Sequence, residues 1–161
     1  MSLKPKRTHI QSNIDFFMDE TATCGGVVVA STVASGGFTD DSAAAVTYTT
    51  APSGKLPIGV LMQDVVNYDL TRQPLNRHKD EVQKGSKVCL WTKGNVVTNS
   101  IYPGQTPAVN KKAYLGPSGL LLSGPGNNPF SNPVVGDWMS SKDEDGYAEV
   151  SINLPQSAPV I

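Results

Sequence analysis

The sequence predicts an all-β domain, and three observations support this. Charged residues make up 17% of the 161-residue chain, whereas an average globular protein has about 25%. Glycine (15) and proline (12) are both abundant, and short apolar runs alternate with turn residues from Gly25 onward. Helical bundles and coiled coils need charged sequence that is poor in glycine and proline. We therefore expect a small β-barrel or β-sandwich with long loops.

The first 23 residues differ from the rest of the chain. Residues 10–18 contain Ile14, Phe16 and Phe17 but follow neither a helical nor a strand period. Two interpretations stay open: an extended N-terminal arm over residues 1–23 with an apolar anchor, or a first strand that starts at the two phenylalanines. The basic N-terminus has no hydrophobic stretch behind it, and no apolar run approaches about 18 residues. We therefore expect neither a secretory signal nor a membrane span.

Beyond Gly25 the runs of apolar or threonine-rich residues predict strands. They are residues 27–29, 45–50, 58–66, 87–92, 95–98 and 147–154. The Lys93-Gly94 dipeptide between two of these runs is typical of a β-hairpin turn. In the last run every second residue is apolar, which predicts one buried and one solvated face. Its apolar residues are Ala148, Val150, Ile152 and Leu154.

Two long loops interrupt the β pattern. Residues 67–84 are crowded with charge, including Arg72, Arg77 and Lys79, and show no apolar periodicity. Residues 123–133 are rich in glycine, proline and asparagine, which break both helices and strand pairing. Loops of this length in a small domain are usually functional.

A short motif occurs twice. Pro52-Ser53-Gly54 recurs as Pro117-Ser118-Gly119, and an apolar-Gly-x-x-Met motif follows each copy in the same order. We interpret the copies as two similar β-modules, each too small to bury its own apolar face and therefore packed together. The predicted organisation is an arm, one β domain and a tail: residues 1–23, 24–155 (modules at about 44–98 and 111–154) and 156–161.

Residues that could carry chemistry are sparse. The sequence contains no GxSxG, HExxH or GxxxxGK[ST] motif. His9 and His78 lack the apolar surroundings that tune a catalytic base. Cys24 and Cys89 are too far apart in sequence for a CxxC pair, so we expect free thiols. Residues 143–146 fit an acidic β-turn better than a calcium loop. We predict no catalytic residue, no cofactor and no metal site.

The pattern of small and apolar residues resembles the capsid decoration (cement) proteins of tailed bacteriophages. In that group a Gly-Val-hydrophobic strand precedes a Gly-x-x-Val-x-Val-x-x-x-Gly-x-Val hairpin. A Tyr-Leu-x-x-x-Gly-Leu segment, a hydrophobic-Gly-x-hydrophobic segment and a terminal alternating strand follow. The corresponding residues here are 56–64, 85–97, 114–120, 135–138 and 148–154. The resemblance covers roughly residues 25–154, and both long loops are longer than the pattern of that group.

The resemblance implies a non-enzymatic virion protein on the outer surface of the capsid, made in the host cytoplasm. Such a protein bridges neighbouring capsomers and stabilises the shell against internal DNA pressure. Its partners would be the major capsid protein and neighbouring copies of itself, with a trimer consistent with the local threefold positions that decoration proteins often occupy. A net charge of −1 argues against nucleic-acid binding, which normally needs a basic surplus, and no membrane partner is expected.

Six residues are the expected capsid contacts, because they lie in irregular segments that the core does not need. They are Ile14, Phe16, Phe17, Arg72, Arg77 and Lys79. Deleting residues 1–18 is then expected to leave the domain folded but abolish capsid binding.

Two other function classes stay open. One is a receptor- or carbohydrate-binding β-module of a phage tail, fibre or adhesin, with Trp91, Trp138 and Tyr147 lining a groove; packing of the tryptophans in a core or interface is the plainer interpretation. The other is an enzyme with an unrecognised site on a β fold.

Overall fold

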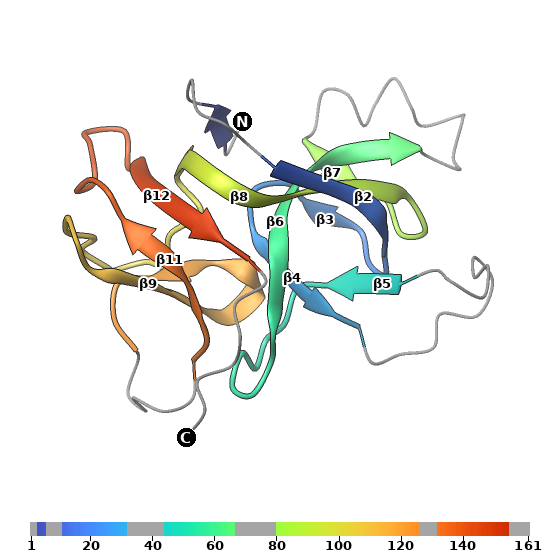
Figure 1. Ribbon diagram of the computed structural model, residues 1–161, viewed down its shortest axis with the longest axis horizontal. Coiled ribbons are helices and arrows are strands. Elements are labelled where there is room, and N and C mark those ends of the chain that lie inside the picture. The colour runs from blue at the N-terminus through green and yellow to red at the C-terminus, as the bar shows by residue number, and fades with distance from the viewer. Residues whose placement is uncertain (1–2, 6–10, 32–43, 67–79, 126–131, 155–161) are drawn as a thin grey trace.

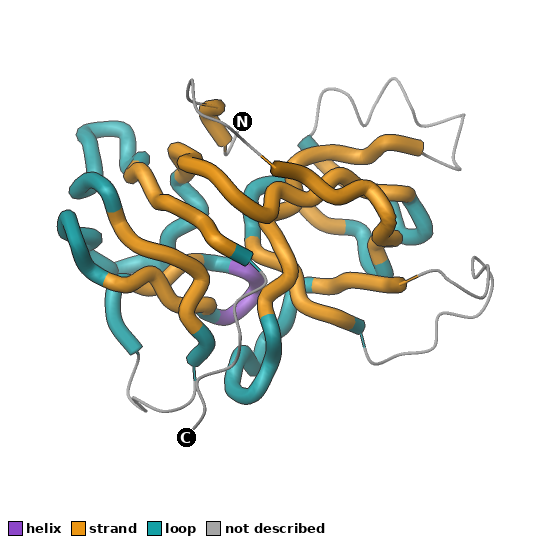
Figure 2. The backbone as a smooth tube through the Cα atoms, in the orientation of Figure 1, coloured by secondary structure: helices purple, strands orange, loops and turns teal. Residues whose placement is uncertain are grey.

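Strands dominate the structure, so the predicted all-β class is confirmed. The structure is a computed structural model that describes residues 3–5, 11–31, 44–66, 80–125 and 132–154. In that part of the chain the strands are β1 (Leu3–Pro5), β2 (Gln11–Met18), β3 (Ala22–Thr23), β4 (Val27–Ala30), β5 (Ala44–Thr47), β6 (Pro57–Val66), β7 (Glu81–Val82), β8 (Lys87–Thr98), β9 (Lys112–Leu115), β10 (Leu121–Leu122), β11 (Val134–Trp138) and β12 (Ala148–Asn153). A 3₁₀ turn, η1 (Pro117–Gly119), is the one helical element there (Figure 2). No described helix is long and apolar enough to cross a bilayer.

The long strand β8 organises the molecule (Figure 1). Its first half pairs with β2 along one edge and with β6 along the other. The pairings β2–β5, β5–β4 and β4–β6 complete a closed ring, which is a small barrel. From the second half of β8 the sheet continues through β12, β11, β9 and β10. The structure therefore has a barrel and a second lobe, and both contain β8.

The hairpin expected at Lys93-Gly94 is wrong. β8 runs as one strand through both residues. Lys93 pairs with Gln11 on one side and with Asn153 on the other, and Gly94 pairs with Ile152. Because strands on both edges supply partners here, the chain has no need to turn back. Gly94 has a φ of +131°, a conformation that favours glycine, at the point where β8 leaves the barrel.

Strands β4, β6 and β8 form a wall between two apolar cores. Val28, Leu61 and Leu90 belong to the barrel core, whereas Val60 and Trp91 belong to the core of the second lobe. Successive side chains of a strand point to opposite faces, so a strand buried on both faces must be apolar at nearly every position. This explains the uninterrupted apolar runs that the sequence shows here.

The alternating strand predicted at the C-terminal end is confirmed. β12 alternates buried and half-buried residues up to Ile152, and the apolar residues of β12 and of the position after it are at most 2% exposed. They are Ala148, Val150, Ile152 and Leu154.

The N-terminal stretch matches neither interpretation in full: β2 is a strand of the barrel, as in the second, but it begins at Gln11, well before the two phenylalanines. β2 pairs with β8 and, in parallel, with β5. Met18 is fully buried, and Phe16 packs against the barrel core. Removing residues 1–18 would expose two strand edges and open the core. The structure therefore predicts that such a truncation unfolds the domain, which is the opposite of the expectation stated above.

Both Pro-Ser-Gly motifs form hydrogen-bonded turns, but of different types, because Ser118 has a φ of +56° whereas Ser53 does not have a positive φ. The backbone N–H of Lys55 donates to the carbonyl of Pro52 (3.1 Å), and that of Leu120 donates to the carbonyl of Pro117 (3.2 Å). The glycines have φ values of +70° and +74°. The flanking strands differ, because β9 and β10 pair directly whereas β4 lies between β5 and β6.

Candidate interaction surface

Three of the six predicted contact residues can be placed, and all three lie on β2. Ile14, Phe16 and Phe17 are in the strand, whereas Arg72, Arg77 and Lys79 lie outside the described residues, as do His9 and His78. Of the charged loop predicted at residues 67–84, the described end contains β7, which pairs with β3.

The side chains of β2 divide between the two faces of the barrel wall. Phe16 is opposite Val88 and contributes to the core. Phe17 follows it and so points to the outer face, where it is half-buried. The four residues of β2 from Asn13 to Phe16 lie opposite only three of β8, from Leu90 to Val88, which is a β-bulge. Ile14 directly follows Asn13 on the outer face and is 46% exposed, and the extra residue of the bulge turns Phe16 inward. The predicted apolar anchor is thus split, with Phe16 inside and the other two outside.

Strand β6 adds apolar surface on the other side of β8. Val65 is 46% exposed, and Gln63, which pairs with Cys89, is also exposed. Val88 and Leu90 point into the barrel, so Cys89 between them points outward. We call this outer surface the β2–β6 face. It comprises Ile14, Phe17, Gln63, Val65 and Lys87, whereas Cys89 points to the same face but is only 8% exposed.

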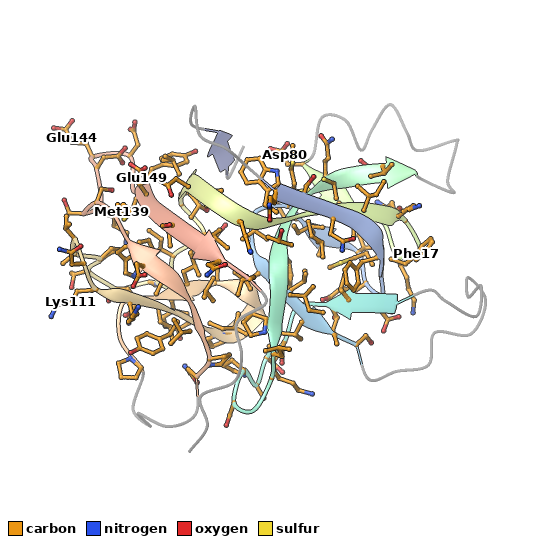
Figure 3. All side chains as sticks on the ribbon, in the orientation of Figure 1. Phe17, Asp80, Lys111, Met139, Glu144 and Glu149 are labelled. Carbon is orange, nitrogen blue, oxygen red and sulfur yellow. The ribbon has the colours of Figure 1, made fainter. Side chains whose placement is uncertain are left out.

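A second apolar patch lies at the far end of the molecule. Figure 3 places Met139 and Lys111 in the second lobe, opposite the end that carries Phe17. Met139 is 43% exposed and Val109 is 57% exposed. The two are close, since the N–H of Asn110 donates to the carbonyl of Trp138 (2.9 Å). Sequence periodicity gave no sign of this patch, because Val109 follows the proline-rich stretch before β9.

The aromatic groove of the carbohydrate-binding alternative is contradicted. Trp138 is fully buried and Trp91 is 5% exposed, and both belong to the core of the second lobe. Both side chains point from their strands, β8 and β11, into that core, so neither ring can stack on a ligand at the surface. The plainer interpretation of the tryptophans as core residues is confirmed.

The cysteines are free thiols, as predicted. Cys89 is buried and Cys24 is half-buried. Burial, together with the carboxylates of Asp80 and Asp64, raises the pKa of Cys24 to about 12. Because the thiolate is the reactive form, this environment disfavours reaction at Cys24.

The acidic segment at 143–146 is a β-turn, as predicted. The N–H of Gly146 donates to the carbonyl of Asp143 (3.1 Å). The Asp143 carboxylate accepts from the N–H groups of Asp145 (3.0 Å) and Tyr147 (2.7 Å). The described residues contain no group of three or more His, Cys, Asp or Glu side chains that could hold a metal ion.

Tyr48 joins the barrel to the second lobe. Its hydroxyl donates to the carbonyl of Thr23 (2.5 Å) and accepts from the N–H of Gly26 (3.1 Å). A Cβ atom at Gly119 would lie 2.6 Å from the Tyr48 ring. The N–H of Ser118 donates to the carbonyl of Thr49 (2.7 Å). The turn of the second Pro-Ser-Gly motif thus packs against Tyr48, which lies just before the first Pro-Ser-Gly motif in the sequence. These residues are far apart in sequence, so the motif spacing gave no indication of the contact.

A cavity of about 370 Å³ opens beside this joint. Its walls are mostly hydroxyl-bearing or acidic residues: Glu20, Thr21, Ala22, Thr23, Tyr48, Thr49, Thr50, Glu81 and Ser118.

Comparisons with known proteins find similarity among solved structures but none in sequence. No protein-family model matches the chain, and no curated protein matches it in sequence. Among solved structures, it is similar to one described as "The crystal structure of head fiber gp8.5 N base in bacteriophage phi29", with a TM-score of 0.48 and 12% sequence identity over 93% of this chain and 98% of that chain. At this level the similarity carries no argument about function.

Proposed function

We propose that this chain is a non-enzymatic structural protein of a tailed-bacteriophage head, which binds the outside of the assembled shell and bridges neighbouring capsomers. The observation that carries the proposal is the resemblance of residues 25–154 to capsid decoration proteins. The residues of that pattern form β6, β8, β9, β11 and β12, which build the wall and the second core. In this proposal the two cores hold the β domain together, and its outer surfaces contact the capsomers.

The β2–β6 face is the proposed contact with the shell. It lies outside the barrel, and it exposes Ile14 and Val65 by 46% each. Complete burial of such a side chain contributes about 1.5–3 kcal/mol, so covering the exposed half of each adds roughly 1 kcal/mol per residue. Such contacts are weak singly. When one molecule bridges two capsomers, the second contact gains from multivalency.

Arg72, Arg77 and Lys79 remain predicted contacts of the segment that follows β6. Copies of the chain around a local threefold position would form a trimer on the shell. The proposed location is the outer capsid surface.

The test is co-sedimentation of the purified chain with mature, undecorated heads of the phage that encodes it. We expect saturable binding at a near-integer ratio to the major capsid protein, which also gives the symmetry of the occupied site. Failure of the folded protein to bind intact heads at any concentration tested would reject the proposal.

A further inference from the structure

The cavity beside Tyr48 has walls fixed by hydrogen bonds between separate elements. One oxygen of the Glu20 carboxylate accepts from the Thr47 hydroxyl (2.7 Å) and from the N–H of Tyr48 (2.7 Å). Elsewhere in the lining, Ser118 is bonded to Thr49 through the backbone hydrogen bond described above. β7 places Glu81 opposite Thr23 of β3. The cavity is therefore formed before any ligand arrives, which lowers the entropic cost of binding.

The unused polar groups of the lining are mainly acceptors. Glu81 has no described partner, and the second oxygen of Glu20 accepts no described bond. Among the lining residues there is no lysine, arginine or histidine. The closest described cation along the chain, Lys84, lies 3.9 Å from Asp19 instead. Carboxylates can only accept, so a ligand that satisfies them must supply N–H or O–H donors, and a positive charge strengthens these bonds.

A sugar fits this lining less well than a cation does. Sugar sites commonly offer an open aromatic face, and Tyr48 is the single aromatic residue of the lining. Its ring packs against Gly26 and Gly119, and its hydroxyl already both donates and accepts. Hydroxyls that have no described bond, such as those of Thr50 and Ser118, can also accept from a cationic donor, in weaker bonds than the carboxylates form.

We propose that this cavity binds a cationic group with several N–H donors, a guanidinium or an alkylammonium. The group could belong to a basic side chain of a protein partner or to a free polyamine, and the chemistry of recognition is the same for both. Glu20 and Glu81 supply the charge, and the threonine and serine hydroxyls supply further acceptors. This inference stands independently of shell binding.

The test is an NMR titration of the full chain with N-acetyl-arginine amide, followed at the backbone amides of Thr21, Thr50 and Ser118. The matched control ligand is N-acetyl-citrulline amide, which keeps the shape but lacks the charge. We expect saturable shifts at the lining with the arginine compound alone. Spermidine in a parallel titration identifies the source, because a polyamine site binds it more tightly than arginine amide and a side-chain site binds it more weakly.

Two variants make the test specific to the cavity. Glu81→Gln should weaken arginine binding by up to about fivefold, the upper value for one exposed ion pair. Glu144→Gln, in the distant exposed turn, removes the same charge and should change nothing. Thr50→Arg places a cation at the rim and should abolish the shifts. Equal shifts with citrulline, shifts that never saturate, or unchanged affinity in both Glu81→Gln and Thr50→Arg would overturn the proposal.

Discussion

Replacing Gly119 with alanine should destabilise the protein far more than the same change in the matching turn. Gly119 has a φ of +74°, which costs a residue with a side chain about 1 kcal/mol. The new Cβ would also lie 2.6 Å from Cδ1 of Tyr48 and 2.9 Å from the carbonyl oxygen of Val27. The Tyr48 hydroxyl is held by two hydrogen bonds, so the ring cannot simply move away. Overpacking of this kind costs about 1–3 kcal/mol.

Gly54 provides the control, because it is the glycine of the first Pro-Ser-Gly turn. Its φ is +70°, and no atom lies within 4 Å of the position of an added Cβ. Gly54→Ala should therefore cost about 1 kcal/mol, against about 2–4 kcal/mol for Gly119→Ala. For a chain of this size, 1 kcal/mol lowers Tm by about 2–4 °C.

The assay is denaturant unfolding of both variants, with thermal melting in parallel. A Gly119→Ala variant that is no less stable than Gly54→Ala would refute the role of the Tyr48 contact. The same contact predicts that Gly119→Ala costs less in a Tyr48→Ala background, where the ring is absent.

Three further predictions concern the barrel. Deleting residues 1–18 should yield an unfolded or aggregated product, as judged by circular dichroism, and a folded, monomeric truncation would contradict the placement of β2. Met18→Ala alone should lower the free energy of unfolding by about 2–5 kcal/mol in denaturant unfolding. Tyr48→Phe should cost about 1–3 kcal/mol, because it leaves the N–H of Gly26 and the carbonyl of Thr23 without their partner; an unchanged unfolding midpoint would argue against these bonds. Burial raises the pKa of Cys24 from 9.0 to about 12 and also raises that of Tyr48, so the unfolded chain loses these protons first as pH rises. The contribution of Cys24 to the free energy of unfolding should thus be complete below pH 9 and decline between pH 9 and 12. Thermal melts across this range should show a smaller loss of stability with pH in Cys24→Ala than in wild type. An identical loss in the variant would exclude the thiol as its cause.

Local patterns predicted the elements whose structure depends on local residues. The alternation from Ala148 to Leu154 requires only one buried face, and the proline, serine and glycine of each Pro-Ser-Gly motif favour a turn, although not one turn type. The burial of the tryptophans follows from their size and apolarity. In these places the sequence and the structure agree.

Elements defined by distant partners were missed for physical reasons. Lys93-Gly94 has the composition of a turn, but strands from both ends of the chain hold β8 straight through it. The β-bulge between Asn13 and Phe16 hides the period of two in β2, so the strand looked irregular. The docking of Gly119 on Tyr48 leaves no periodic signal in either segment.

The central claim is that the β2–β6 face binds the shell, and head-binding isotherms of surface variants test it most directly. The variants are Ile14→Lys with Val65→Lys and, as the control, Leu56→Lys, whose side chain is 47% exposed just before the opposite end of β6. All these changes are at exposed positions, so the proteins should fold with stability within about 1 kcal/mol of wild type. We predict that the double variant loses head binding and that Leu56→Lys keeps the wild-type affinity and stoichiometry. Wild-type binding by the folded double variant would contradict the claim.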